Sequence, residues 1–589
     1  MAVQSLNRSY LMFAGMLFLI LLVRLAHLQL YSREKYFSES ERNRVRNVIL
    51  AAPRGQVLDR NGRILVDNRP AYSVSVIPYE FLKSEAAIRL LADILQMPPE
   101  ALIAKIKKEK ISNFHPVRIK RQIDFRELGD IEENRLDLPG VFYSVEPRRA
   151  YPGGVKAPHL FGYLGEITAR ELSSLEEDNY RMGDVIGKSG IELEYENDLK
   201  GLAGVKYVEV DVLGREVREL PELAGSPHKP GQNLYMTVDA KLQAHLEASM
   251  TGRKGAAVVL DPRNGDVLAI LSKPDYDPEL FSNPLTPKIW NELINHPEKP
   301  LYNRSCLSVY PPGSTYKLVL AAAGLETGAI NLTERITCRG AYRLGRRSFK
   351  CWKKQGHGSV NLLAAIQGSC NVYFYQKGLD VGLENWSKYS RIFRFGTRTG
   401  IDLPNESAGL VPDKKYLDDT YGEKRWTRGL LLNMAVGQGD LLTTPLQMAY
   451  FAMIVGNEGV AYQPRLVKKI VDPSTGAGTV TRARGIPIEG ISKKTYETLK
   501  EGMWRVVNAL GGTGRAASVP GVDVCGKTGT AQNPHGNSHA WFIGFAPREN
   551  PEIAFCIMVE NGGGGGAVAA PIAGSLLLLY FENQKVAFN

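Results

Sequence analysis

Ser314 and Lys317 are the side chains whose types and spacing point most directly to chemistry. Two prolines and Gly313 precede them and an apolar run over 318–323 follows, so we expect Ser314 at the N-cap or in the first turn of a helix. Residues three apart share one face of a helix, which lets the Lys317 amine reach the Ser314 hydroxyl. A serine hydroxyl is a weak nucleophile until a base takes its proton, and a lysine in an apolar pocket can be that base. The start of a helix also offers backbone N–H groups to an oxyanion.

Two later motifs strengthen this interpretation, because Ser-x-x-Lys by itself is weak evidence. The chain continues with Ser369-Cys370-Asn371 and then with Lys527-Thr528-Gly529-Thr530. The order Ser-x-x-Lys, then Ser-x-Asn, then Lys-Thr-Gly resembles that of the penicillin-recognising serine acyltransferases.

This resemblance implies a role for each catalytic residue. Ser314 attacks an amide carbonyl and Lys317 accepts its proton. Ser369 passes a proton to the leaving amine, and Asn371 hydrogen-bonds the backbone of the substrate. Lys527 presents a cation to a substrate carboxylate.

The same resemblance places the substrate beside the last motif. The substrate-binding residues that it implies are Thr528, Gly529 and Thr530. The backbone N–H groups of Ser314 and Thr530 form the implied oxyanion hole, in which each donor is typically worth about 3–4 kcal/mol.

Length and composition favour a globular protein of several domains. The chain has 589 residues, 44% of them hydrophobic and 23% charged, which predicts two to four domains. The net charge of +11 could indicate nucleic acid, but no long basic run, finger spacing or aromatic RNA-binding motif accompanies it. A basic concentration at Arg42, Arg44 and Arg46 instead fits the neighbourhood of an anionic membrane, so we expect no nucleic-acid partner.

Residues 10–30 form the candidate membrane anchor. The stretch is apolar over 11–23 and long enough for one crossing, and no small-residue cleavage site follows it. It therefore predicts an uncleaved single-pass anchor in the inner (cytoplasmic) membrane, with residues 1–9 as a short cytoplasmic tail and the body on the periplasmic side. Arg24 and His27 either face a membrane partner or reach the outer interface.

Residues 31–230 are predicted to form a non-catalytic pedestal of the dimerisation type. The segment from Ala52 to Arg63 contains Asn61-Gly62, a strong hairpin signal. This segment resembles the first motif of the class B penicillin-binding proteins, in which we expect its charged residues to pair with one another. An inserted head subdomain is expected at about 80–145, where the pattern is helical.

Residues 231–589 are predicted to form the transpeptidase domain. Apolar strands are expected over 255–260, 267–271, 539–545 and 553–559, with helices near both ends of the segment. The chain is therefore expected to be a multi-domain α+β protein. It combines a single transmembrane helix, an extended β-rich pedestal and a penicillin-binding fold with a central antiparallel sheet and an inserted α-helical lobe.

Three cysteines and a histidine suggest a metal site. Cys338, Cys351, His357 and Cys370 could supply three thiolates and one imidazole, the usual shell of a structural zinc. Some class B relatives of the elongation type are similar in having a metal site in this region. The alternatives are a Cys338–Cys351 disulfide, or unrelated buried thiols. No cofactor is expected for catalysis.

The resemblance covers essentially the whole chain, and it implies a peptidoglycan D,D-transpeptidase of the elongation type. The enzyme would cross-link D-alanyl-D-alanine stem peptides through a Ser314 acyl-enzyme, and β-lactams would trap that serine. The implied partners are a RodA-type membrane glycan polymerase and the scaffold proteins of the elongation complex.

Other functions remain open at this point. The chain could be a septal class B transpeptidase, or chiefly a scaffold that activates a partner polymerase. A serine β-lactamase would need neither an anchor nor a pedestal, and a sensor would usually have several membrane spans and a cytoplasmic output domain.

Overall fold

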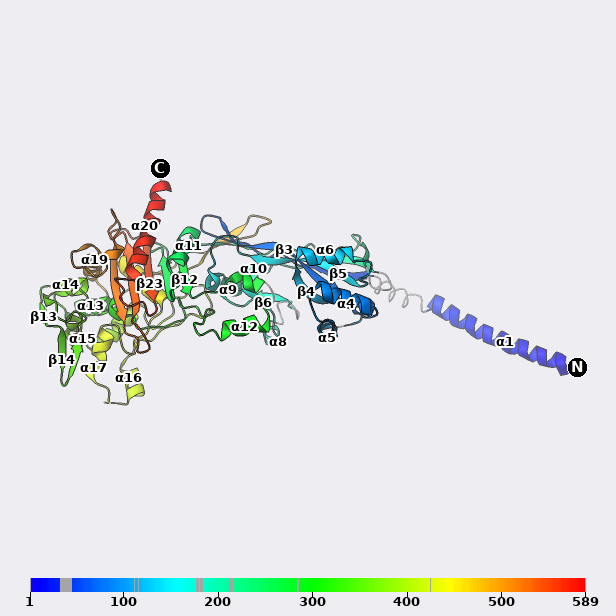
Figure 1. Ribbon diagram of the computed structural model, residues 1–589, viewed down its shortest axis with the longest axis horizontal. Coiled ribbons are helices and arrows are strands. Elements are labelled where there is room, and N and C mark those ends of the chain that lie inside the picture. Colours follow the sequence, from blue (N-terminus) through cyan, green and yellow to red (C-terminus); the bar gives the residue numbers. More distant parts are fainter. Residues whose placement is uncertain are drawn as a thin grey trace. The chain divides into compact units, whose positions relative to one another are not determined.

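The structure is a computed structural model that describes residues 2–31, 45–110, 112–114, 116–175, 180, 184–210, 216–282, 285–423 and 425–587. Arg42 and Arg44 lie outside the described residues. Contacts divide the chain into two compact units (Figure 1). The first unit comprises Met1–Pro53, Pro70–Arg148 and Gly201–Pro230, and the second comprises Arg54–Arg69, Arg149–Lys200 and Gly231–Asn589. Residues 31–230 thus contribute to both units, and the domain limits drawn along the sequence stay a prediction.

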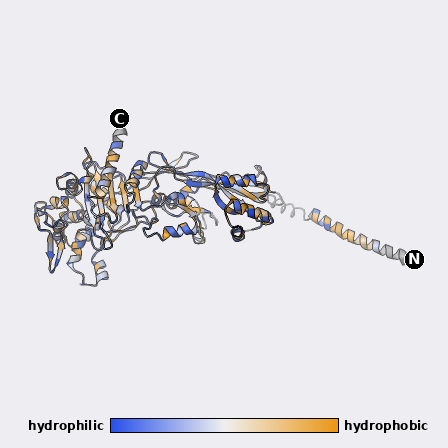
Figure 2. Cartoon of the chain, viewed as in Figure 1, coloured by the Kyte–Doolittle hydropathy of each residue, from blue (hydrophilic) through white to orange (hydrophobic). Residues whose placement is uncertain are grey.

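The first unit begins with a long apolar helix. Helix α1 (Ala2–Ala26) continues into a short π-helical turn, η1 (His27–Tyr31). The stretch Met12–Gln29 has a mean hydropathy of 1.8, and it is long and apolar enough to cross a membrane. Figure 2 shows the hydrophobic residues along this helix. The predicted amino-terminal apolar helix is therefore present.

The rest of the first unit combines strands with a small helical core. Strands β1 (Val45–Leu50), β8 (Gly204–Val210) and β9 (Glu216–Glu219) form one antiparallel sheet. The second half of β3 (Ile64–Val76) pairs with β4 (Val117–Ile123), and β5 (Val141–Ala150) also pairs with β3. Helices α3 (Pro78–Phe81), α4 (Glu85–Ile94), α5 (Pro99–Glu109) and α6 (Phe125–Glu133) enclose a hydrophobic core of their own, including Phe81, Leu91 and Leu102.

The predicted Asn61-Gly62 hairpin is present at the start of the second unit. Strand β2 (Val57–Leu58) pairs with the beginning of β3, and Gly62 adopts a φ of 86° in the turn between them. The Asp59 carboxylate accepts hydrogen bonds from the backbone N–H groups of Asn61 (2.8 Å) and Arg63 (2.9 Å). Short elements follow in the same unit: α7 (Pro158–Phe161), β6 (Leu164–Glu166), α8 (Ala169–Ser174), β7 (Val185–Gly187), α9 (Gly190–Glu194) and α10 (Glu196–Leu199).

Arg54 forms its ion pairs outside the segment from Ala52 to Arg63, with Glu192 and Glu196. The expectation that the charged residues of this segment pair with one another is therefore wrong for Arg54. The Glu192 carboxylate accepts from Arg54 at 2.8 Å and from Arg149 at 2.7 Å, and the side chains of Glu192 and Arg149 are almost completely buried. Burial by itself would raise the pKa of Glu192, but Arg149 and Arg54 outweigh it and hold that pKa below its usual range. The role of these residues is structural, because removing one member would leave an uncompensated charge in the interior.

A five-stranded antiparallel sheet is the centre of the second unit, with the strand order β12-β11-β23-β22-β21. The strands are β11 (Gly255–Leu260), β12 (Val267–Lys273), β21 (Cys525–Ala531), β22 (His539–Ala546) and β23 (Ile553–Val559). Every residue of β11 and β23 is buried, so both faces of the sheet are covered. Helix α18 (Pro445–Gly456) packs on β11, β22 and β23, while α20 (Ala569–Ala587) packs on β22, β23 and α11 (Ala240–Ser249). The predicted central sheet and terminal helices are confirmed.

The predicted helical lobe is inserted between β12 and β21. Its helices are α13 (Lys317–Glu326), α14 (Leu362–Gln367), α15 (Asn371–Ile392), α16 (Lys414–Tyr421) and α17 (Arg428–Ala435). Two small strand pairs accompany them: β13 (Ile336–Cys338) with β16 (Gly358–Val360), and β14 (Ala341–Leu344) with β15 (Arg347–Lys350). Residues 317–324 of α13 are all buried, so this helix carries Lys317 into the interior of the lobe.

The remaining elements of the second unit frame this core. They are β10 (Asn233–Met236), η3 (Pro278–Ser282), α12 (Pro287–Ile294), β17 (Val460–Tyr462), β18 (Val467–Val471), β19 (Gly478–Val480), β20 (Gly485–Pro487), α19 (Lys493–Asn508) and η5 (Arg515–Ala517).

Candidate active site and metal cluster

Ser314 lies in a tight turn just before helix α13. The turn is a 3₁₀-helix, η4 (Gly313–Tyr316), and the α-helix begins only at Lys317. Ser314 is therefore not the N-cap of an α-helix. Gly313 shapes the turn: it has a φ of 59°, and its N–H donates to the Gly437 carbonyl at 2.8 Å. In a 3₁₀-helix, side chains three residues apart eclipse one another, so Ser314 and Lys317 still share a face.

Residues of all three motifs meet around the hydroxyl of Ser369. The Ser369 Oγ lies 3.2 Å from the Lys317 Nζ and 3.0 Å from the Lys527 Nζ. Lys317 also donates to the Ser369 carbonyl at 2.8 Å and to the Asn371 Oδ1 at 2.6 Å. Ser369 has a φ of 53°, a left-handed conformation that is strained for a residue with a Cβ. The fold thus brings together four of the five predicted catalytic side chains, with Ser314 in the turn next to them.

Burial sets the charge state of the two lysines. Lys317 and Lys527 are both fully buried. Burial lowers the pKa of Lys317 to about 8. Burial, and then repulsion from Lys317, lowers the pKa of Lys527 well below its usual range. Lys317 can therefore be neutral near physiological pH, the condition that a lysine needs in order to accept a proton.

The Lys-Thr-Gly motif lies on β21, the last strand in the order of the sheet. Thr530 is exposed, whereas Thr528 is buried and its hydroxyl lies 2.7 Å from that of Thr513. A Cβ on Gly529 would lie 2.9 Å from the Pro312 carbonyl oxygen, so glycine lets the serine turn pack against the strand. Sequence reasoning missed Thr513, and its only signal is the Gly-Gly-Thr-Gly turn after α19.

The segment from Gly437 to Asp440 links the serine turn to this strand. The Gln438 Nε2 donates to the Thr530 carbonyl at 3.2 Å, and the Gln532 N–H donates to the Gln438 Oε1 at 3.3 Å. Together with the Gly313–Gly437 hydrogen bond, these contacts fix the position of the serine turn relative to β21. The segment therefore supports the position of the serine turn.

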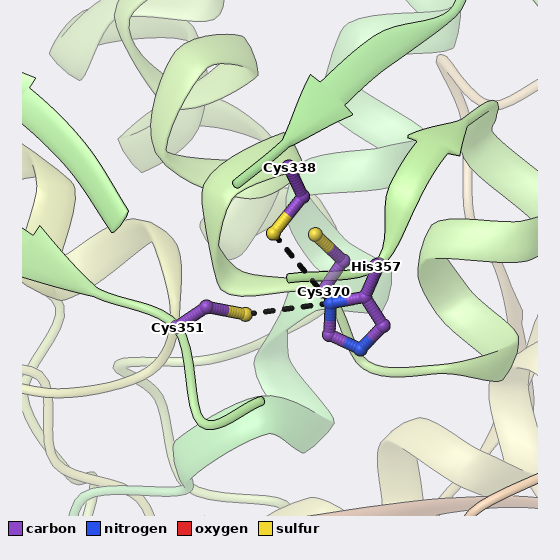
Figure 3. Close-up of side chains that lie close together, drawn as sticks. All are labelled: Cys338, Cys351, His357 and Cys370. Atoms are coloured by element: carbon purple, nitrogen blue, oxygen red, sulfur yellow. Dashed lines mark hydrogen bonds between the residues drawn. The ribbon is translucent and has the colours of Figure 1, made fainter. Parts of the chain in front are cut away.

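Cys338, Cys351, His357 and Cys370 converge into one cluster (Figure 3). One ligand atom from each of these residues lies within 4.8 Å of the others. The His357 Nδ1 is 3.6 Å from the Cys338 sulfur and 3.5 Å from the Cys351 sulfur. The six cysteines of the chain are free in the structure, so the alternative Cys338–Cys351 disulfide is not formed.

The chemistry of this cluster fits a zinc ion. The His357 Nε2 lies 3.0 Å from the Gly368 carbonyl, and donating to that oxygen leaves Nδ1 unprotonated and facing the sulfurs. Three thiols and one imidazole in this arrangement match the donor set of structural zinc. A hydrogen bond between the sulfurs of Cys351 and Cys370 lowers the pKa of Cys351 to about 4 and raises the pKa of Cys370.

Comparisons with known proteins agree with this architecture. The profile of the Penicillin binding protein transpeptidase domain matches residues 255–578, and that of the Penicillin-binding Protein dimerisation domain matches residues 49–236. The chain is 34% identical to the peptidoglycan D,D-transpeptidase MrdA of Acinetobacter baumannii, over 92% of this chain and 83% of the relative. It is 32% identical to MrdA of Escherichia coli K12, over 94% and 91% of the two chains.

Solved structures show the same similarity. Penicillin-binding protein 2 (PBP2) of Helicobacter pylori, solved in a complex with MreC, matches with a TM-score of 0.78 and 29% identity, over 91% of this chain and all of that chain. A chain in a structure of a peptidoglycan synthase complex that coordinates polymerization and crosslinking matches with a TM-score of 0.72 and 28% identity, over 98% of both chains. The chain therefore belongs to the class B penicillin-binding proteins, the D,D-transpeptidases in which a dimerisation domain precedes the transpeptidase domain.

Proposed function

We propose that this chain cross-links peptidoglycan during cell-wall elongation through an acyl-enzyme at Ser314. The observation that carries the proposal is the buried cluster in which Lys317 and Lys527 both contact the Ser369 hydroxyl beside the serine turn. The donor is a stem peptide that ends in D-alanyl-D-alanine, and β-lactams react as mimics of it. The relatives named MrdA and the PBP2–MreC complex favour the elongation type over the septal one.

The proposal includes a sequence of proton and bond changes. Neutral Lys317 takes the Ser314 proton while Oγ attacks the carbonyl carbon of the penultimate D-alanine. The carbon–nitrogen bond to the last D-alanine then breaks, and Ser369 relays a proton to the leaving amine. An amine of a second stem peptide attacks the resulting ester and releases Ser314, and its proton returns through the same groups.

The other motif residues hold the substrate in this proposal. Lys527 and the hydroxyls of Thr528 and Thr530 bind the carboxylate of the terminal D-alanine, whose negative charge favours the protonated form of Lys527 when the substrate is bound. Asn371 binds the peptide backbone. The N–H groups of Ser314 and Thr530 stabilise the oxyanion.

The proposal also includes a place and a partner. Helix α1 anchors the chain in the cytoplasmic membrane, with the body on the outer side where peptidoglycan is assembled. A RodA-type glycan polymerase supplies the strands, because no sequence signal of a glycosyltransferase separates the anchor from the pedestal. The elongation-complex scaffold includes a protein of the kind that binds the Helicobacter relative.

We further propose that Cys338, Cys351, His357 and Cys370 hold a structural zinc ion. The ion would join β13, the loop after β15 and the start of α15 through four protein bonds. Cys370 lies between Ser369 and Asn371 in the chain, so a metal bond to Cys370 would restrain the backbone that positions these two side chains.

Acylation by benzylpenicillin tests the nucleophile. We expect one covalent adduct on the wild-type chain by intact mass and none on Ser314→Ala, because only a Ser314 ester is stable enough to detect. Slow loss of the adduct is expected, since an efficient β-lactamase would release it quickly. A folded wild-type chain that forms no adduct would remove the enzymatic proposal and leave the scaffold function.

The rate of acylation should rise with pH. The pKa of Lys317 is lowered to about 8, and only the neutral amine accepts a proton, so the rate should increase through about pH 8 and level off above it. Stopped-flow measurement of penicillin acylation gives this profile. Lys317→Arg should be inactive at every pH because a guanidinium stays protonated, and a flat profile for the wild type would rule out Lys317 as the base.

Two glycines with the same backbone conformation test the position of the serine turn. Gly437 and Gly439 have φ values of 73° and 74°, so alanine is equally strained at both. A Cβ on Gly437 would lie 2.0 Å from the Gly313 carbonyl oxygen, whereas the atom nearest to a Cβ on Gly439 is 3.5 Å away. Gly437→Ala should slow acylation about 100-fold by displacing the turn, and Gly439→Ala should retain most of the rate. Equal effects would show that the contact with the turn is unimportant.

Metal analysis of the purified chain, without an affinity tag, tests the zinc site. We expect about one equivalent of zinc, and its loss in Cys338→Ser and His357→Ala with a lower midpoint of thermal unfolding. Cys306→Ser is the matched control, because Cys306 is also buried but lies outside the cluster. A chain without zinc whose cysteines are paired by mass would contradict the site.

A further inference from the structure

A strongly basic surface adjoins the Ser-x-Asn motif. The stretch 335–354 contains eight Arg or Lys residues, and no acidic residue occurs between Glu334 and Asp380. All eight cations are exposed: Arg335, Arg339, Arg343, Arg346, Arg347, Lys350, Lys353 and Lys354. Apolar and small residues separate most of them, so the sequence shows no continuous basic run.

The hairpin β14–β15 carries four of these eight cations. Tyr342, Leu344 and Phe349 pack against the hydrophobic core, and the ring of Phe349 meets that of Tyr375 on α15 at 5.7 Å. Arg343 and Lys350 belong to the alternate set of positions, so they point away from that core. Arg346 and Arg347 follow at the tip of the hairpin.

These cations are not neutralised within the described parts of the chain. Glu334, the acidic residue that precedes the stretch, pairs with Lys377 at 2.7 Å. No carboxylate in the part of the chain that the structure describes forms a salt bridge with any of the eight. Eight exposed like charges repel one another, so the surface favours an anionic ligand.

Direct contacts connect this surface to the catalytic residues. The Asn371 Nδ2 donates to the Lys350 carbonyl at 3.3 Å. The Trp352 Nε1 donates to the Gly368 and Ser369 carbonyls, both at 3.1 Å, and Lys317 donates to the same Ser369 carbonyl. Trp352 nevertheless remains 58% exposed. An indole whose N–H is hydrogen-bonded and whose ring remains largely exposed offers an apolar surface beside the Ser-x-Asn motif.

We propose that the basic hairpin surface, defined as the eight cations together with Trp352, binds the carboxylate-bearing peptidoglycan strand on its way into the active site. This inference rests on the proposed function and specifies its substrate as an anionic strand rather than an isolated peptide terminus. Stem peptides carry several free carboxylates along a glycan, and arginine forks bind carboxylates well. Lys350 and Trp352 connect the surface to Asn371 and Ser369, which favours the substrate over a lipid membrane or a protein as its ligand.

Binding of uncross-linked peptidoglycan strands tests this inference on the full-length protein in a neutral amphipol. The variant Arg343→Gln/Arg346→Gln/Arg347→Gln removes three cations from the hairpin. The control Lys468→Gln/Arg482→Gln/Arg484→Gln removes three exposed cations from another part of the second unit. We expect the hairpin variant to bind fluorescent strands about tenfold more weakly and the control to bind as the wild type does. Equal weakening in both variants would overturn the inference.

A chemical change to the ligand makes the test independent of any variant. Strands whose carboxylates have been amidated should bind the wild type about tenfold more weakly than unmodified strands. Equal binding of both strands would overturn the inference. A membrane ligand is the alternative, tested by flotation with vesicles of equal parts phosphatidylcholine and phosphatidylglycerol. A hairpin variant that no longer floats with these vesicles but still binds strands would also overturn the inference.

The cross-linking reaction separates this inference from the proposed function. Benzylpenicillin labelling of Ser314 reports the catalytic centre, because acylation by the drug requires no glycan strand. A hairpin variant that is acylated by benzylpenicillin at the wild-type rate but, in a separate assay without the drug, cross-links nascent strands about tenfold more slowly supports the inference. A variant that cross-links at the wild-type rate overturns it. Failure of the wild type to label would count against the proposed function instead.

Discussion

The site depends on the removal of two lysines from water. An ammonium group without a full set of partners is costly in a protein interior, and the usual outcome is that it gives up its proton. The buried, mostly apolar helix α13 carries Lys317 into that environment, where its amine contacts the hydroxyl of Ser369. The buried strand β21 brings Lys527 to the same Ser369 hydroxyl. The carbonyl of Ser369 and the amide oxygen of Asn371 accept from Lys317, so the amine is fixed in place even when it is neutral. Burial thus favours the neutral form that the proposed base needs, and the two hydrogen bonds fix its orientation.

Much of this arrangement can be predicted from the sequence because the signals are local. The three motifs, the apolar strands of the sheet and the Asn61-Gly62 hairpin each depend on residues that are close together in the chain. The rest depends on contacts between distant segments. Nothing near Gln438 indicates that its amide meets the carbonyl of Thr530, and nothing near Gly313 indicates a 3₁₀ turn held by Gly437. The basic residues of 335–354 escaped notice for a different reason: they lie close together in the chain, but other residues separate them, so they form no continuous basic run.

The segment from Cys338 to Asn371 connects three features that the sequence presents separately. His357 contributes to the cysteine cluster through one ring nitrogen and contacts the Gly368 carbonyl through the other. Trp352 donates to the Gly368 and Ser369 carbonyls from the outside, and Lys317 donates to the Ser369 carbonyl from the inside. The backbone around Ser369 is thereby held from several directions, which is how a left-handed serine can persist there.

The close packing of the serine turn has a consequence for natural selection. A side chain at Gly437 or Gly529 would collide with backbone atoms of the turn, at 2.0 Å and 2.9 Å. A population exposed to a drug that imitates the substrate therefore cannot place a side chain at either glycine without displacing the turn that holds Ser314. Resistance mutations have to arise at positions that are less tightly packed. The geometry of a few backbone atoms thereby restricts which mutations can spread.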